Sequence, residues 1–287
     1  MSEFRVSPPK VFPQATRAAK PPMDAAGSAD AYRQTTFVLG GEVELVLDGL
    51  RLEAAIAEAS AGAKFRKQAT ASAMALWSRG WLSRVEALHA VEWGNYAAAV
   101  TLVRAAADFQ AAMLYLLRTN AAEWDEWLTG GGVQLAAEDH AMEFRLHAFR
   151  AAEVLAAHDV LGPIYRASTD LSLSHFGSTL AFAGAESDPT RIAVTFGDRD
   201  FHLGLAEVHL GWMLQLSGAL LADITEFPVY FANPDAAAVE KWRTAAGSTT
   251  GNRDRCRLES VEREGMKRYL VHNWRREPRS APKKLLL

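Results

Sequence analysis

Cysteine is almost absent from this 287-residue sequence, since Cys256 is the only one. A single cysteine excludes an internal disulfide framework and any zinc site built on several cysteines. The first ten residues, MSEFRVSPPK, contain no apolar run of the kind that forms the core of a secretory signal. We therefore expect a protein of the reducing cytoplasm, where structural disulfides are rare.

The short motifs that mark common active sites are also missing. No GxSxG stretch is present to hold a nucleophilic serine at a strand-to-helix turn. One ExxH pattern occurs, from Glu86 to His89, whereas di-iron four-helix bundles use two such units and two further glutamates. We therefore assign no metal and no cofactor to this sequence.

Long apolar runs free of charge are lacking as well. The most apolar stretch, residues 96–117, is about long enough to span a bilayer. However, Arg104 and Asp108 stand in its middle, and charges at that depth of a membrane are costly. The stretch is better explained as a buried helix, and we expect no transmembrane segment.

Apolar residues make up 49% of the chain and charged residues 23%, which is typical of a globular protein. The charge is unevenly distributed. Residues 34–250 carry 15 Lys/Arg and 26 Asp/Glu, a net charge of −11, while residues 251–287 carry 11 and 5, a net charge of +6. The acidic body argues against a broad nucleic-acid footprint, so nucleic acid can bind only through the basic tail. That tail can instead be solvated, or pack on an acidic surface of its own chain or of a neighbour.

Apolar periodicity predicts a mainly α-helical protein: a single multi-helix bundle with a small β-hairpin insertion near residues 179–197. Residues 1–32 are rich in proline and poor in large apolar groups, so we expect an extended or disordered arm. Residues 33–246 form the predicted helical domain. Residues 247–287 are predicted to be a linker followed by a basic C-terminal helix, near residues 253–275, and a tail.

The helix predicted at residues 95–119 carries a narrow polar stripe on an otherwise apolar surface. At ~100° per residue, its polar members fall within roughly 60° of one another: Thr101, Arg104, Asp108 and Tyr115. Arg104 and Asp108 are four residues apart and can pair along the helix. Two interpretations stay open: a structural ion pair that fixes helix register, or an arginine that orients an anionic or carbonyl ligand.

A second polar stripe follows within residues 165–179. If this segment is helical, hydroxyls and one imidazole share a face: Tyr165, Ser168, Ser172, His175 and Thr179. These groups are either small packing residues around a satisfied core histidine or part of a site. We hypothesise that the two stripes face each other, which would place Arg104 or Asp108 within hydrogen-bond reach of His175 or Ser172.

Arg84 and His89 have the R-x4-H spacing that HEPN-type ribonucleases use. In such a pair the histidine serves as a general acid or base and the arginine stabilises phosphate charge. An amphipathic surface helix gives the same six-residue pattern by chance. The two residues are therefore an alternative catalytic pair and not an assigned one.

The segments GNYAAAVTLVRAAADFQAAMLYLLR and YRASTDLSLSHF, within residues 70–225, resemble a group of uncharacterised bacterial all-helical domains that are HEPN-like. Those domains pair a helix bearing an arginine, followed one turn later by an acidic residue, with a later Tyr…Ser…His helix. The resemblance implies an all-helical fold and a polar cluster formed by five residues here: Arg104, Asp108, Tyr165, Ser172 and His175. It implies no activity.

Two hypotheses about function follow. In the first, the protein is a helical interaction or assembly protein that self-associates or joins a protein complex, with its acidic body meeting a basic tail. In the second, it is a HEPN-like ribonuclease that uses Arg84 and His89, or a small-ligand binder that uses the Arg104 cluster.

Overall fold

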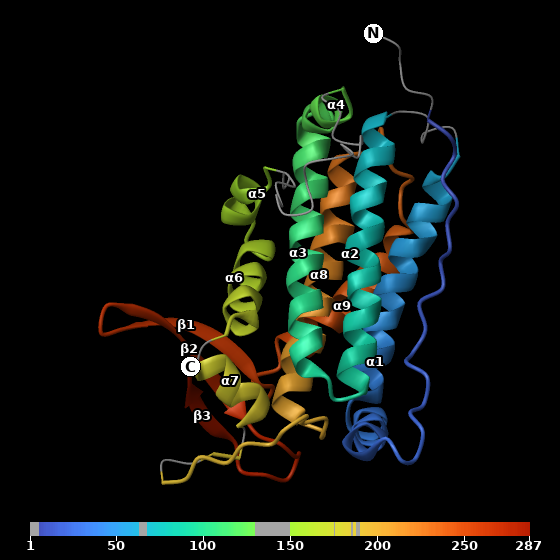
Figure 1. Ribbon diagram of the computed structural model, residues 1–287. Helices are drawn as coiled ribbons and strands as arrows, with labels where there is room; N and C mark the ends of the chain where they lie inside the picture. The colour runs from blue at the N-terminus through green and yellow to red at the C-terminus, as the bar shows by residue number, and fades with distance from the viewer. Residues whose placement is uncertain (1–5, 63–67, 130–149, 175, 185, 188–189) are drawn as a thin grey trace, which may run out of the picture.

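The computed structural model describes residues 6–62, 68–129, 150–174, 176–184, 186–187 and 190–287. Long helices that run side by side form the body of the molecule (Figure 1): α1 (Ala26–Ser60), α2 (Gln68–Glu92), α3 (Tyr96–Arg118) and α8 (Leu203–Asp223). A three-stranded sheet lies at one corner of this bundle. The predicted mainly α-helical fold with a small β component is therefore confirmed.

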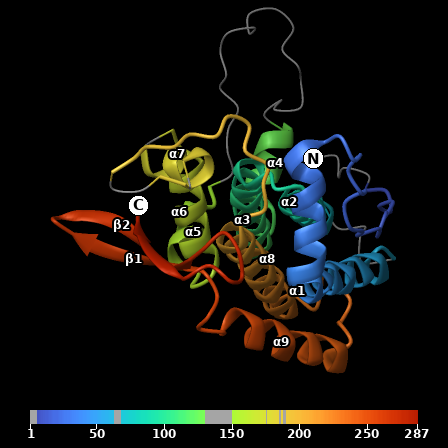
Figure 2. The same ribbon diagram turned by 90° about the horizontal axis from the view of Figure 1, so that it is seen from below.

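Shorter helices surround the bundle, and their bounds are α4 (Ala122–Thr129), α5 (Ala152–Ala157), α6 (Leu161–Ser172), α7 (Phe176–Ala183) and α9 (Ala236–Thr250). A short 3-10 turn, η2 (Ile224–Glu226), continues from α8. Seen along the bundle axis, α9 lies outside α8 and α6 lies outside α3 (Figure 2). Residues 130–149, which precede α5 in the chain, lie outside the described residues.

Small residues let α2 and α3 pack closely. A Cβ atom added to Gly80 of α2 would lie 3.4 Å from the carbonyl oxygen of Ala106 on α3. The turn between the helices contains Gly94 at φ +71°, a conformation that side chains rarely adopt, and Asn95 then caps α3 by accepting from the N–H of Ala98. The helix predicted at residues 95–119 is confirmed to within one residue at each end.

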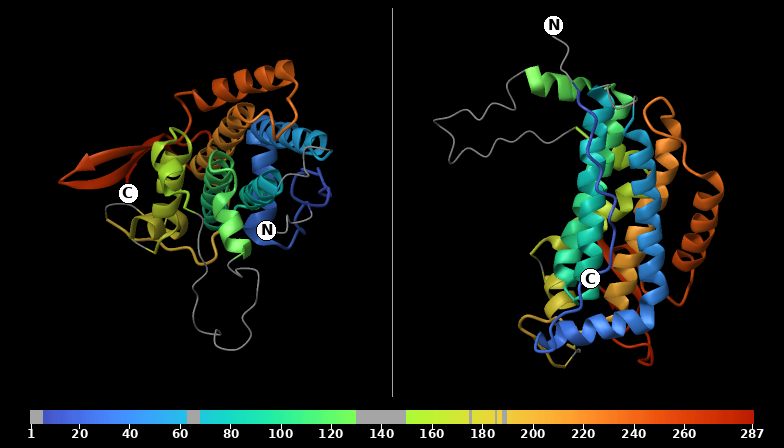
Figure 3. Two further views of the ribbon diagram at one scale, coloured as in Figure 1. Left: turned by 90° about the horizontal axis from the view of Figure 1, so that it is seen from above. Right: turned by 90° about the vertical axis from the view of Figure 1, so that its right-hand side faces the viewer.

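The centre of the bundle is α8. Every residue from 201 to 210 is buried, because α8 is surrounded by other elements on most of its circumference (Figure 2). The first part of α1 runs across the end of the bundle and the rest runs along it (Figure 3). Gly40 and Gly41 interrupt α1, and helices commonly bend at glycine pairs.

The predicted N-terminal arm is extended but attached to the bundle. The backbone N–H of Ala18 donates to Glu92 at 2.8 Å, and the Trp93 indole donates to the carbonyl of Ala19 at 2.9 Å. The prediction that the arm continues to residue 32 is wrong, because α1 begins at Ala26. This first turn has no side-chain cap, and burial of Ala31 and Thr35 against the bundle stabilises it instead.

The β-hairpin lies at the C-terminus and not near residues 179–197. Antiparallel strands β1 (Arg257–Arg263), β2 (Met266–Trp274) and β3 (Lys283–Leu286) replace the helix predicted near 253–275. The tight turn between β1 and β2 places Glu264 and Gly265 at φ +57° and +72°, which no right-handed helix accommodates. Closely spaced charges in this segment imitate the pattern of an amphipathic helix. They mask the alternation of apolar and polar side chains around Leu258 that is typical of a strand.

The hairpin prediction for residues 179–197 is wrong for two local reasons. Residues 176–183 form α7, and burial of Ser178 and Ala181 holds this helix against the bundle although Gly177 and Thr179 are poor helix formers. The following apolar segment, residues 191–196, has one isolated bridge residue, Arg191, and forms no strand among the described residues. The linker predicted from residue 247 also begins later, since α9 continues to Thr250.

Two helices of the described chain, α3 and α8 with η2, are long and apolar enough to cross a membrane by length and composition. In each, most of the apolar window is buried inside the bundle, 61% in α3 and 72% in α8 with η2. Core helices of globular bundles have the same properties. These helices therefore provide only weak support for a membrane protein.

Two buried histidines of the central helix are held neutral. His209 is fully buried, with Nδ1 2.6 Å from the carbonyl oxygen of Leu205, and its Nε2 has no partner within the described part of the chain. Burial lowers the pKa of His209 to about 4. His202 caps the helix by accepting from the N–H of Leu205, and burial together with the Arg276 charge lowers its pKa to about 3.

We predict that the free energy of unfolding decreases as the pH falls from about 6.5 to about 4. In that window the unfolded chain binds protons on these histidines and the folded chain does not, so stability rises with pH. Each histidine contributes a slope of up to about 1.4 kcal/mol per pH unit. Urea unfolding at a series of pH values measures this slope for the wild type and for His209→Phe. The slope of the variant should be smaller by about the contribution of one histidine. Identical slopes for the two proteins would refute the assignment.

Candidate functional site

Arg84, the arginine of the R-x4-H pattern, lies in the closed core. Its guanidinium forms a two-pronged ion pair with Glu53 of α1, at 2.5 Å and 2.6 Å, and donates to the Ser217 hydroxyl of α8 at 2.7 Å. The Trp77 indole donates to the same Glu53 carboxylate at 3.1 Å. Arg84 is 2% exposed, so this guanidinium is already satisfied and has no access to a phosphate.

His89 lies on a different face of α2. Five helical residues turn the chain through ~500°, which separates Arg84 and His89 by roughly 140° around the axis. The His89 ring is partly exposed, with Nε2 2.8 Å from the carbonyl oxygen of Thr16 and Nδ1 3.7 Å from Glu86. The geometry therefore argues against a ribonuclease site formed by Arg84 and His89.

The two predicted polar stripes do meet, through Arg104 of α3 and Tyr165 of α6. The guanidinium of Arg104 donates to the Thr169 hydroxyl at 3.0 Å and to the Tyr165 hydroxyl at 3.2 Å, and lies 5.3 Å from the centre of the Tyr165 ring. Burial raises the pKa of Asp108, and the nearby Arg104 charge opposes this shift. Thr169 was missed, although it lies one turn after Tyr165 on the same helix face.

The remaining members of the predicted cluster are not brought to Arg104 by the described contacts. Ser172 is exposed, and its hydroxyl donates to the carbonyl oxygen of Thr169 at 2.8 Å. His175 lies outside the described residues, so its part of the hypothesis stays a prediction. As described, the contact between α3 and α6 is a partly buried polar seam.

His158 joins the α5–α6 corner to α8. Its Nδ1 accepts from the backbone N–H groups of Val160 and Leu161 at 3.1 Å and 3.3 Å. Nε2 therefore carries the proton and donates to Asp223 at 3.3 Å, and Gln110 donates to the other Asp223 oxygen at 3.2 Å. Burial raises the pKa of Asp223, and its contacts with His158 and Gln110 oppose this shift. Because both ring nitrogens are used, His158 fixes the corner and is not free to act as a base.

Beside this corner, two adjoining cavities follow the exposed face of α8. The first, of about 630 Å³, lies between α8 and α9, and the second, of about 720 Å³, continues between α6, α8 and strand β1. Both are lined by Asp159, Val160, Gln215 and Thr250, so they form one continuous depression, which we call the α8 groove.

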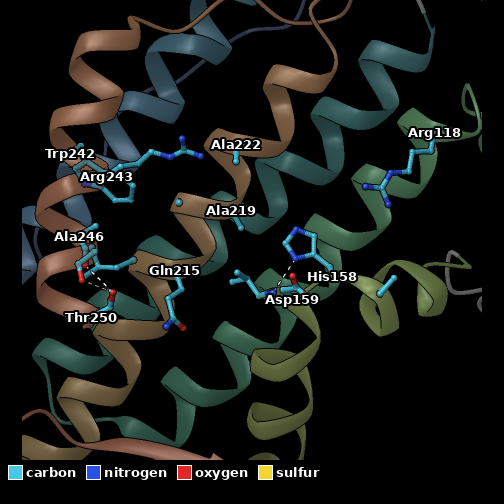
Figure 4. Close-up of a pocket in the computed structure, with 15 residues that line it drawn as sticks. Arg118, His158, Asp159, Gln215, Ala219, Ala222, Trp242, Arg243, Ala246 and Thr250 are labelled. Carbon is cyan, nitrogen blue, oxygen red and sulfur yellow. Dashed lines mark hydrogen bonds between the residues drawn. The ribbon is translucent and has the colours of Figure 1, made fainter. Parts of the chain in front are cut away.

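The floor of the α8 groove is built from small residues. Ala219 and Ala222 of α8 face Ala246 and Thr250 of α9 across the first cavity (Figure 4). Trp242 closes one side of this floor, and its indole donates to the carbonyl of Leu45 at 2.8 Å. Small side chains leave room for another polypeptide to approach the α8 backbone closely.

The rim of the α8 groove is basic although the body of the protein is acidic. Its exposed cations form no ion pair within the described part of the chain, and they are Arg118, Arg166, Arg243, Arg257 and Lys267. Three carboxylates also line the groove. Asp159 is exposed, the Asp170 side chain accepts from Tyr269, and that of Glu207 accepts from the backbone N–H of Cys256. An unpaired positive rim around an apolar floor favours a ligand that is both acidic and apolar.

Two arginines of the basic tail, Arg255 and Arg276, form ion pairs with carboxylates of the helical body. Arg255 forms an ion pair with Glu42, and Arg276 binds Glu186 at 2.7 Å and Asp198 at 3.1 Å. These contacts attach the sheet to the helical body, so part of the tail's charge is already neutralised.

The described residues hold no obvious reaction centre. No three His, Cys, Asp or Glu side chains among them lie close enough to share a metal ion. Burial raises the pKa of the Cys256 thiol to about 12, which keeps it protonated and unreactive. No family model, curated protein or solved structure matches this chain. The resemblance to HEPN-like domains therefore stays a prediction.

We predict that Arg84→Met lowers the free energy of unfolding by about 3–5 kcal/mol, because it leaves the Glu53 carboxylate buried and unpaired. The double variant Arg84→Met/Glu53→Leu should recover part of this loss, since no unpaired charge remains. Urea titration measures both. Arg118→Met, which alters an exposed arginine, is the matched control and should change stability by less than about 0.5 kcal/mol. An equally small effect of Arg84→Met would contradict the role given to the pair.

Proposed function

We propose that this protein is an interaction protein whose docking site is the α8 groove, and that the groove receives an acidic amphipathic segment of a partner protein. The observation that carries the proposal is the unpaired basic rim around a floor of alanine and glycine, on a body of opposite charge. The sequence hypothesis had an acidic surface meeting the basic tail. The tail borders the groove through Arg257 and Lys267, which supports a contact between this basic region and an acidic partner.

The shape of the groove supports a polypeptide occupant. Lining residues on α8 run from Glu207 to Ala222, which corresponds to roughly 23 Å of helix. Elements on both sides, α9 on one and α6 with β1 on the other, leave this strip of α8 uncovered. A helix laid in such a groove buries its apolar face against small residues, as in other helix-in-groove complexes.

The charges support an acidic occupant in particular. Cations from four different elements surround the groove: Arg118 at the end of α3, Arg166 on α6, Arg243 on α9, and Arg257 on β1. None of them is neutralised by an ion pair within the described residues. Rim charges of this kind steer association and make it sensitive to salt.

Binding of two synthetic 18-residue amphipathic peptides tests the proposal. They share the same apolar face and carry glutamate or lysine on the polar face, and fluorescence anisotropy of a labelled end measures their affinity. The glutamate peptide should bind, and its affinity should fall at least tenfold between 50 mM and 500 mM NaCl because the rim is exposed to solvent. The lysine peptide should not bind.

Variants then locate the binding site. Gly247→Trp fills the groove, and the fold tolerates it because a Cβ at Gly247 meets no atom within 4 Å. Ser248→Trp places the same side chain on the next, exposed residue, outside the groove, and is the matched control. Gly247→Trp should lower the affinity for the glutamate peptide at least tenfold, and so should the double variant Arg243→Glu/Lys267→Glu. Ser248→Trp should leave this affinity unchanged. Equal binding of both peptides, or binding that ignores Gly247→Trp, would refute the proposal.

A further inference from the structure

A second surface, formed by residues that do not line the α8 groove, is unusually apolar. It is the segment RIAVTF, residues 191–196, which follows α7 and runs beside it (Figure 2). Alternate side chains are exposed: Ile192 by 72%, Val194 by 72% and Phe196 by 101%. Leu173 and Phe176, at the junction of α6 and α7, are 56% and 73% exposed. Five of the large exposed apolar residues of the described chain thus belong to this short region.

One edge of residues 191–196 is hydrogen-bonded to the body of the protein. The N–H of Thr195 donates to the carbonyl of Ala183, the last residue of α7, at 2.8 Å. The Ser187 hydroxyl accepts from the N–H of Ala193 at 3.0 Å and donates to the Ala193 carbonyl at 3.1 Å. Both bonded residues of the segment, 193 and 195, therefore turn their backbone groups inward.

The other edge makes no backbone hydrogen bond to any residue that the structure describes. In an extended chain, the backbone groups of consecutive residues point to opposite edges, so those of Ile192, Val194 and Phe196 point away from the body. Within the described part of the chain, these groups have no hydrogen-bond partner. An apolar edge of this kind is a ready template for another strand.

We infer that residues 191–196 pair antiparallel with the same segment of a second copy of this chain, with Val194 opposite Val194. In this register Ile192 of each copy lies opposite Phe196 of the other. The free backbone groups then form about six hydrogen bonds, because residues 192, 194 and 196 all fall in hydrogen-bonded pairs. All six large apolar side chains share one face of the ribbon, where cross-strand pairs stabilise the contact.

The area and charge of this surface suit a second copy. Its two phenylalanines alone contribute on the order of 300–400 Å², and a standard interface buries ~800 Å² per partner. Exposed charges of both signs surround the segment, with Arg191 and Arg199 beside Glu186 and Asp200. A mixed rim can meet its own copy with opposite charges facing. An anionic lipid surface would instead repel half of these charges.

Sedimentation velocity of the full chain tests the inference. The wild type should sediment as a species of twice the 31.3 kDa of one chain. Val194→Lys and Val194→Glu each place two like charges opposite each other and should raise the dimer Kd at least tenfold. Mixing the two variants places lysine opposite glutamate and should restore the dimer. Phe37→Lys, at a residue that is 90% exposed on α1, is the matched control and should leave the dimer unchanged.

A monomeric wild type overturns the inference, and so does a dimer that survives both Val194 substitutions. If each variant is monomeric but their mixture is too, the Val194–Val194 register is wrong. Circular dichroism and thermal melting confirm that the variants are folded, as expected for a surface position. The inference is separate from the proposed function: Gly247→Trp should leave the dimer intact, and Val194→Lys should still bind the glutamate peptide.

Discussion

A buried ion pair between Arg84 and Glu53 joins three of the four long helices at their centre. Arg84 comes from α2 and Glu53 from α1, and Ser217 of α8 accepts from the same guanidinium. Such a pair tolerates little displacement, because a shift along any of the three helices would leave a charge unpaired in the core. The relative register of α1, α2 and α8 therefore depends on it.

The position of α8 has consequences on both of its sides. On the inner side it packs against α1, α2 and α3, and its histidines are held neutral among apolar groups. Its outer side is left between α6 and α9 as a strip of small residues. The side chains of Arg84 and His158 are satisfied by partners within the protein. The proposed docking site lies at the surface instead, where the basic tail contributes Arg257 and Lys267 beside the groove.

Much of the helical framework was predictable because helices are encoded locally. Apolar periodicity located α3, and the facing of Arg104 and Tyr165 followed from the polar stripes on their two helices. Thr169 shares the face of Tyr165 and was predictable from the same spacing. The C-terminal sheet was mistaken for a helix, because charges in Arg257–Trp274 recur at helical spacing while the Glu264–Gly265 turn sets the register. Conversely, residues 191–196 have the composition of a β-strand, but the described residues near them in the chain form no second strand with which they could pair.

By itself, the sequence determined the fold class, the approximate position of most helices and the contrast between an acidic body and a basic tail. These follow from composition and from patterns within a few residues. Only the tertiary structure decided which polar residues are enclosed and which are available. Arg84 stands 31 residues from Glu53 and 133 from Ser217, and no local spacing encodes such a meeting. The groove has the same origin, since its floor and rim are assembled from helices and a strand that are far apart in the chain.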